Sequence, residues 1–223
     1  MAGDFSAAPL VHAGGPPPTL SIEIARERAR ALATAGRRRI LGIAGTPGAG
    51  KSTLARRVVD DLHPAAVYVP MDGFHLANHE LLRLGRRDRK GAVDTFDAAG
   101  FVSMLERLRA NAGEVVYAPS FLREYEEPIA GWIPVAPDVP LVVTEGNYLL
   151  VPDGAWGRVA PLLDETWYVE IDEELRIERL ITRHAAYGKS ADDARRWALG
   201  SDQVNASLVA ATRSRADVVV QLS

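Results

Sequence analysis

Apolar and polar residues form alternating blocks along the chain, and the spacing within the blocks changes between strand-like and helical. Short, nearly unbroken apolar runs predict strands at 39–44, 67–69, 114–117, 141–144, 166–171 and 217–220. Apolar positions at helical spacing predict helices at 19–35, 52–62, 79–84, 98–110, 173–187 and 191–213. Because strands and helices alternate, we expect an α/β fold with a mainly parallel central sheet flanked by helices.

The segment after the first predicted strand carries the most specific pattern in the chain. Residues 45–52 read Gly-Thr-Pro-Gly-Ala-Gly-Lys-Ser, which is the G-x-x-x-x-G-K-[ST] pattern of a phosphate-binding P-loop. Its glycines let successive N–H groups curl around a phosphate, and the following helix directs its positive dipole end at the same anion. The strand before and the helix after match the context that this motif requires, which disfavours a chance glycine-rich turn.

Within this segment, Lys51 is expected to place its charge on the β- and γ-phosphates, and Ser52 to offer its hydroxyl to Mg²⁺. The segment therefore predicts ATP and Mg²⁺ as cofactors. The residues expected to contact the nucleotide are Gly45, Thr46, Pro47, Gly48, Ala49, Gly50, Lys51, Ser52 and Thr53.

Two acidic residues follow predicted strands, at the edge where parallel sheets bind their ligands. Asp72 is a candidate base for a substrate hydroxyl or a Mg²⁺ ligand, and its alternative is a helix cap. Glu145 ends an apolar run in the Walker-B arrangement, which would hold Mg²⁺ or orient a substrate. Its alternative role is a structural ion pair.

Basic residues supply further candidates. Arg89 and Lys90 lie in a glycine-flanked basic stretch that either closes over a substrate or is a solvated loop. Arg179 and Arg183 share one face of a predicted helix and are candidates to clamp phosphates in a closing lid. For Arg176 we favour ion pairing on its own helix.

Composition limits the remaining classes of function. The 223 residues are 47% hydrophobic with a formal net charge of -3, which favours one domain and disfavours a nucleic-acid binder that works through bulk charge. The absence of cysteine excludes disulfides and thiolate chemistry. With no apolar run of membrane-spanning length and no secretory pattern at the N-terminus, we expect a cytoplasmic protein without a membrane partner. Residues 1–18 are expected to be a flexible arm, and 19–223 the domain.

The order of the motifs resembles a known group of kinases. The P-loop is followed by Asp72-Gly73-Phe74-His75, then by Arg89-Lys90-Gly91-Ala92 with Asp94-Thr95-Phe96-Asp97, and then by Glu145-Gly146-Asn147-Tyr148. This resembles the P-loop kinases that include uridine kinase, phosphoribulokinase and bacterial type I pantothenate kinase. It looks most like the branch of nucleoside/nucleotide kinase-like or fructose-transport-kinase-like proteins. The resemblance implies a P-loop NTPase fold with a helical lid and, as in many relatives, a homodimer as one expected form.

The resemblance also implies roles for individual residues. Asp72 matches the base, Glu145 the acidic residue after the Walker-B strand, and Arg179 and Arg183 the lid. Asp202 and Asn205 are expected near the nucleotide. The residues expected at the acceptor are Asp72, His75, Arg89, Lys90, Glu145 and Tyr148.

Two positions depart from the pattern of the relatives. Phe121 is followed by Leu122 where relatives often carry an aromatic-Asp pair, and Val93 stands where they often have proline. The first departure affects a segment that helps to shape the acceptor pocket, so the specificity of uridine or pantothenate kinases does not transfer directly.

The leading interpretation is an ATP-dependent kinase that phosphorylates a hydroxyl of a nucleoside, a pantothenate-like compound or a sugar. An alternative is a regulatory ATPase that hydrolyses nucleotide to control a protein partner. A third class, a binding module without catalysis, is disfavoured by intact Lys51, Ser52, Asp72 and Glu145.

Overall fold

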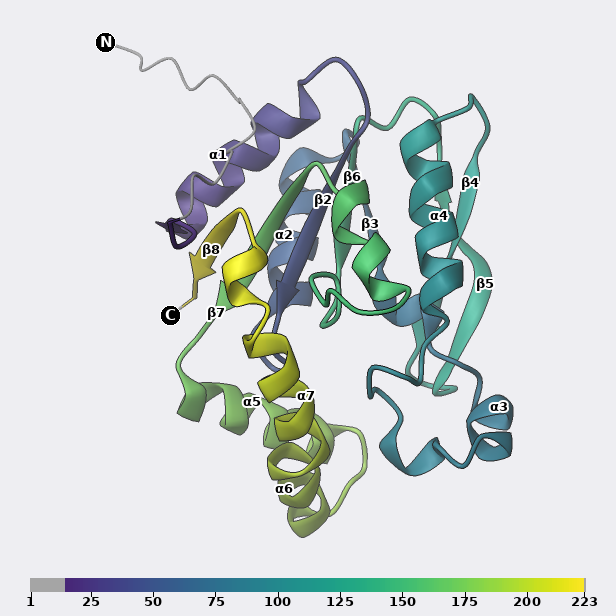
Figure 1. Cartoon of the computed structure of the whole chain (residues 1–223), viewed down its shortest axis with the longest axis vertical. Helices are drawn as coiled ribbons and strands as arrows, with labels where there is room; N and C mark the ends of the chain where they lie inside the picture. The colour runs from purple at the N-terminus through teal and green to yellow at the C-terminus, as the bar shows by residue number, and fades with distance from the viewer. Residues whose placement is uncertain (1–14, 223) are drawn as a thin grey trace.

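A six-stranded parallel sheet runs through the centre of the computed structural model, which describes residues 15–222 (Figure 1). The strand order is β1-β8-β7-β2-β6-β3, and every neighbouring pair is parallel, as the alternation of strands and helices predicted. The strands are β1 (Thr19–Leu20), β2 (Arg39–Gly45), β3 (Ala66–Pro70), β6 (Leu141–Glu145), β7 (Glu165–Glu170) and β8 (Val218–Gln221).

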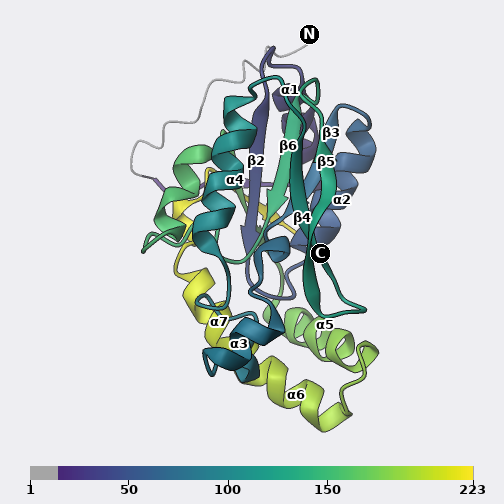
Figure 2. The same cartoon turned by 90° about the vertical axis from the view of Figure 1, so that its right-hand side faces the viewer.

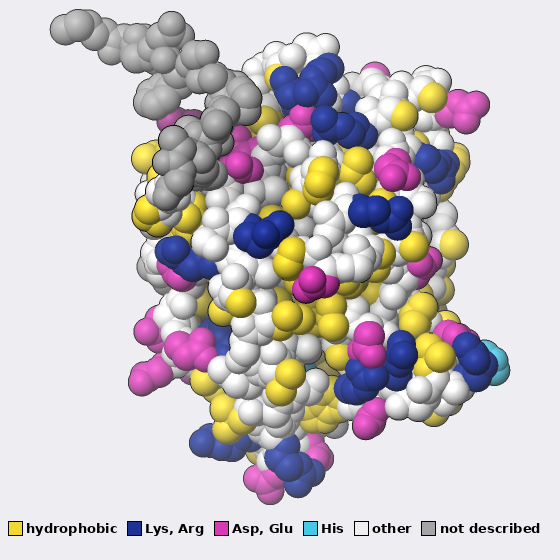
Figure 3. Space-filling model, viewed as in Figure 1, with side chains coloured by type: hydrophobic (Ala, Val, Ile, Leu, Met, Phe, Trp, Pro, Cys, Tyr) yellow, Lys and Arg dark blue, Asp and Glu magenta, His cyan; other side chains and the backbone are white. Residues whose placement is uncertain are grey.

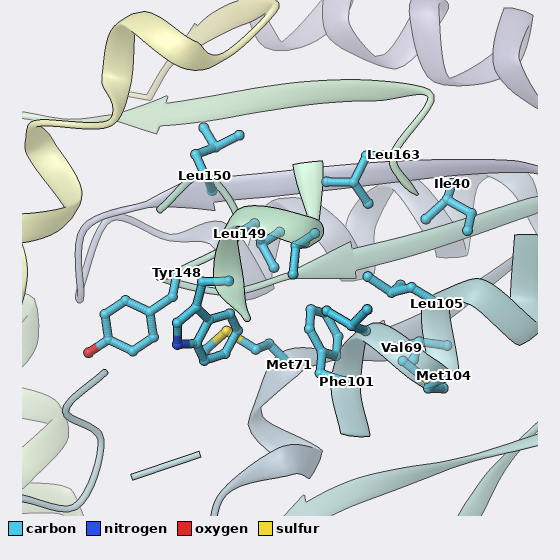
Figure 4. Close-up of a cluster of buried hydrophobic side chains, with 14 of the residues drawn as sticks. Ile40, Val69, Met71, Phe101, Met104, Leu105, Tyr148, Leu149, Leu150 and Leu163 are labelled. Atoms are coloured by element: carbon cyan, nitrogen blue, oxygen red, sulfur yellow. The ribbon is translucent and has the colours of Figure 1, made fainter. Parts of the chain in front are cut away.

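Helices cover both faces of the sheet. Neighbouring residues of the central strand β2 point to opposite sides, so each face presents apolar side chains that a helix can bury. Leu41 packs in a cluster with α1 (Ile22–Ala33) and α2 (Lys51–Leu62), while Ile40 packs in a second cluster with α4 (Ala98–Ala110). Figure 2 shows α4 and α2 on opposite sides of β2 and β6. Figure 4 shows the second cluster, which brings Phe101, Met104 and Leu105 of α4 together with Ile40 of β2.

Four helices gather at the end of the sheet where β2 and β6 terminate (Figures 1 and 2). This end therefore carries the strand termini and the elements that can cover a ligand bound there. The helices are α3 (Asn78–Arg83), α5 (Glu173–Ala186), α6 (Ala191–Leu199) and α7 (Ser201–Ala210).

Two predicted helices have the wrong bounds. The helix predicted at 19–35 begins only at Ile22, because Thr19–Leu20 pair with β8 and the Ser21 side chain caps the helix. The helix predicted at 191–213 is broken at Gly200, where the backbone leaves the helical region with φ -102 and ψ -97. The break separates α6 from α7.

The pattern also missed an antiparallel hairpin. The extended piece predicted at 114–117 is strand β4 (Val116–Leu122), which pairs with β5 (Glu127–Val135). The hairpin packs on the segment that carries Asp72: a Cβ on Gly73 would lie only 2.4 Å from the Pro119 carbonyl oxygen. Only glycine therefore allows this approach of β4.

Residues 1–14 of the expected N-terminal arm lie outside the described residues. Within the rest of that segment, the Pro18 carbonyl oxygen accepts a hydrogen bond from the Val219 amide, next to β1. No helix within residues 15–222 is long and apolar enough to cross a membrane.

Candidate active site

The P-loop connects β2 to α2 in a backbone conformation that its glycines permit. Gly48 and Gly50 have φ values of 84° and 92°, in the left-handed region that disfavours other residues. The turn is closed by a hydrogen bond from the Ala49 amide to the Thr46 carbonyl oxygen (3.1 Å). The loop leads directly into the N-terminus of α2, where backbone N–H groups favour an anion.

Lys51 projects from the start of α2 and is buried. Its Nζ donates to the Thr46 carbonyl oxygen (2.9 Å) and to Asn147 Oδ1 (2.7 Å), which are both uncharged. Burial lowers the pKa of Lys51 to about 8, although Glu145 and Asp72 oppose the shift. A phosphate beside this ammonium would compensate its charge, which is the role the sequence predicted.

Glu145 ends β6 as a buried carboxylate. Its Oε1 accepts hydrogen bonds from the Tyr68 hydroxyl (2.6 Å) and the Ser52 hydroxyl (3.1 Å). Burial raises the pKa of Glu145, and the charge of Asp72 adds to the shift. Both effects disfavour a bare carboxylate and favour one beside a cation, so Ser52 and Glu145 fit the hard oxygen ligands of Mg²⁺.

Asp72 lies in a 3-10 turn, Met71–Phe74, directly after β3. The His75 ring fixes this turn: Nδ1 lies 2.8 Å from the Asp72 carbonyl oxygen, and since a carbonyl only accepts, Nδ1 carries the proton. Phe96 and Phe121 pack on the ring, at 4.0 and 4.7 Å between ring centroids. Burial lowers the pKa of His75, so it is a neutral donor that positions Asp72.

The lid helix α5 approaches the P-loop through three arginines. The guanidinium of Arg176 is buried and donates to the Pro47 carbonyl oxygen (3.1 Å) and to both carboxylate oxygens of Glu173. The favoured ion pairing of Arg176 is thus confirmed, and the same side chain ties α5 to the P-loop. Arg179 and Arg183 instead line the cavity over the loop.

Two adjoining cavities of about 670 Å³ and 360 Å³ meet at these residues. The larger reaches along α2 and the second half of α5, and the smaller reaches past Asp72 toward α6 and the segment around Gly91. The residues shared by the two walls are Lys51, Ser52, Asp72, Phe121, Arg123, Glu145, Arg183 and Tyr187.

Three predicted site residues take positions behind the cavity wall or at its edge. Arg89 pairs with Asp94 and lines neither cavity. The buried Tyr148 donates its hydroxyl hydrogen to the Gly91 carbonyl oxygen (2.6 Å). Asn205 lines the smaller cavity and donates to the same oxygen (3.4 Å). Tyr148 and Asn205 thus hold the segment at Gly91 against the site.

Sequence reasoning missed four residues of the site. Asn147 binds Lys51, and its place after Glu145 is the one signal that could have indicated it. Tyr68 binds Glu145 from the middle of β3. Arg123 lies 3.9 Å from Asp72 and stacks over the ring of Tyr187, 5.2 Å from its centroid. Nothing local in the sequence marks these last three residues.

Known proteins resemble this chain in sequence and in fold. A model of the family described as "Phosphoribulokinase / Uridine kinase family" matches residues 40–223. A provisionally assigned uridine kinase of Schizosaccharomyces pombe is 30% identical over 193 residues, 82% of this chain and 82% of that protein. A pantothenate kinase of Sorangium cellulosum is 30% identical over 210 residues, 82% of this chain and 68% of that protein.

A solved structure extends the likeness to three dimensions. It is that of a provisionally assigned fructose transport system kinase from Silicibacter sp. TM1040, which is 31% identical. It superposes with a TM-score of 0.80 over 92% of this chain and 100% of that one.

Proposed function

This chain belongs to the phosphoribulokinase/uridine kinase family and is an ATP-dependent kinase of small molecules, and we propose that its acceptor is a nucleoside, a pantothenate-like compound or a sugar. The observation that carries this proposal is the shared wall of the two cavities. Lys51 and Asp72 both lie on it, so a phosphate held by the P-loop and a hydroxyl beside Asp72 can meet there.

The residues divide the work of phosphoryl transfer, which needs positioning and neutralisation of charge more than covalent chemistry. The P-loop and Lys51 hold the phosphates of ATP. Asp72 orients the acceptor hydroxyl and accepts its proton, while His75 keeps the turn of Asp72 in place. Arg179 and Arg183 stabilise the charge on the transferring group from the lid.

Ser52 and Glu145 would hold Mg²⁺ together with the phosphates of ATP. Bound there, the ion supplies neutralisation of the developing phosphate charge. The Tyr68 hydroxyl bond at 2.6 Å fixes the Glu145 carboxylate toward Ser52, so these two ligands are oriented before a nucleotide arrives.

The test is a coupled assay of ADP release from Mg·ATP by the purified protein, with nucleosides, pantothenate, sugars, sugar phosphates and polyols as acceptors. We expect one chemical class to stimulate ADP release above the rate with ATP alone. A flat rate across all classes would overturn the proposal and favour a regulatory ATPase.

The substitution Asp72→Asn removes the proton acceptor while keeping the size of the side chain. Turnover with the stimulating acceptor should fall by about 100-fold or more, the usual contribution of general base catalysis. Mg·ATP binding, measured by calorimetry, should stay within a few fold of wild type. Wild-type turnover in Asp72→Asn would exclude Asp72 as the base.

A further inference from the structure

One wall of the smaller cavity lies away from the P-loop and is not required to bind the nucleotide phosphates. It lies beyond Asp72 and is built from the segment around Gly91 and the turn of the β4-β5 hairpin. We call it the acceptor wall, and it consists of Arg87, Lys90, Phe121, Arg123 and Glu126.

Lys90 places a positive charge in this wall without a carboxylate in direct contact. Its ammonium donates to Asn78 Oδ1 (2.8 Å) and to the Glu126 carbonyl oxygen, and it lies 5.0 Å from the centroid of the Phe121 ring. All three partners are uncharged, and Lys90 forms no ion pair with any residue in 15–222. Partial burial lowers the pKa of Lys90, although the charges of Glu127 and Glu126 oppose the shift, so these carboxylates act on the ammonium from beyond ion-pair distance.

The other two cations of the acceptor wall are weakly paired. Arg123 is 3.9 Å from Asp72 Oδ2, longer than a hydrogen bond. Arg87 forms no ion pair with any residue in 15–222. The acceptor wall thus presents three cations and one carboxylate, Glu126.

This positive charge is local to the cavity. Figure 3 shows one face of the molecule, on which basic and acidic side chains are interspersed. The formal net charge of the chain is -3. That face carries no broad basic surface, and a small anion in the cavity is the partner that the cations of the acceptor wall fit.

We infer that the acceptor carries its own anionic group, a carboxylate or a phosphate, which Lys90 binds while Arg123 assists and the acceptor hydroxyl faces Asp72. This inference rests on the proposed function and narrows its acceptor class. A neutral acceptor would cover the ammonium of Lys90 without compensating it, which costs free energy. An anion would also draw Arg123 away from Asp72 and leave that carboxylate free to accept a proton.

Matched acceptors that differ in one anionic group test the inference. Suitable pairs are pantothenate and panthenol, glycerate and glycerol, and ribose 5-phosphate and ribose. We expect kcat/KM for ADP release to be at least about 10-fold higher for the anion in a pair that is used, since a charged hydrogen bond contributes about 1.5–3 kcal/mol. The first two pairs report a carboxylate and the third a phosphate.

The substitution Lys90→Gln should raise the KM for the anionic acceptor by about 10- to 100-fold and leave kcat and the KM for Mg·ATP nearly unchanged. Lys90→Arg should restore most of the affinity. Arg83→Gln is the matched control, because Arg83 is an exposed cation on the preceding helix that pairs with Glu80. A simple loss of folding would lower kcat and would not be rescued by arginine.

A binding measurement gives the answer without turnover. With Mg·ADP filling the P-loop, inorganic phosphate should raise the melting temperature of the wild type saturably, and this shift should be lost in Lys90→Gln. Equal use of neutral and anionic partners would overturn the inference and leave the proposed function intact. Absence of both the phosphate shift and acceptor-stimulated ADP release would overturn the two together.

Discussion

At the scale of single residues, Lys51 and Glu145 are the two buried ionisable groups on which binding of Mg·ATP depends in this account. Both are buried, and burial shifts their pKa values toward the uncharged forms. Neutral partners hold them in place: Asn147 binds Lys51, and the hydroxyls of Ser52 and Tyr68 bind Glu145. A phosphate beside Lys51 and a divalent cation beside Glu145 would stabilise the charged form of each residue. The free site is therefore arranged for ligands of opposite charge to these two residues.

This arrangement predicts the pH dependence of nucleotide binding. Burial places the pKa of Lys51 at about 8, and a bound phosphate raises it. Between the two pKa values, binding takes up a proton, and affinity falls by up to about tenfold per pH unit as the pH rises. Calorimetry of Mg·ADP binding above pH 8, in buffers of different ionisation enthalpy, measures that uptake. Binding without proton uptake would show that Lys51 stays charged in the free protein.

At the scale of elements, the sequence was most informative where chemistry sits at the end of a strand. The P-loop, Asp72 and Glu145 were predicted because each follows an apolar run, and parallel strands end at one edge. The hairpin that supplies Arg123 was not predicted, since its proline-rich strands lack clean alternation and Arg123 meets Asp72 only in three dimensions. The break at Gly200 was missed because a single glycine inside a helical pattern is ambiguous.

Packing between α5 and the P-loop predicts that Gly48→Ala lowers the unfolding free energy more than a glycine substitution elsewhere. A Cβ there would lie 2.8 Å from Leu180 Cγ and 2.9 Å from the Arg176 carbonyl oxygen, so Gly48→Ala would push α5 away from the P-loop. Gly131→Ala is the control, because Gly131 also has a positive φ but would meet nothing within 4 Å. We expect Gly48→Ala to lose about 1–3 kcal/mol more unfolding free energy than the control.

Urea denaturation of both variants measures this difference, and the KM for Mg·ATP should rise in Gly48→Ala alone. Equal losses of unfolding free energy in the two variants would show that backbone strain, and not contact with the lid helix, explains the cost of substituting Gly48.

At the scale of the whole molecule, three structural units meet at one place. The sheet supplies the P-loop, Asp72 and Glu145, the hairpin supplies Arg123, and α5 supplies Arg179 and Arg183. The lid is tied to the P-loop through the buried Arg176 and the Pro47 carbonyl oxygen, while Arg123 contacts Tyr187 at the end of α5. We therefore expect closure over a nucleotide and binding of an acceptor to act on the same side chains.

The measurement that tests the central claim most directly is the stoichiometry of the reaction. ADP, phosphorylated acceptor and free phosphate should be quantified together over one time course with the stimulating acceptor. Transfer to a metabolite predicts one phosphorylated acceptor for each ADP and little free phosphate. Free phosphate in step with ADP, with no phosphorylated acceptor, would contradict the claim and identify a hydrolase.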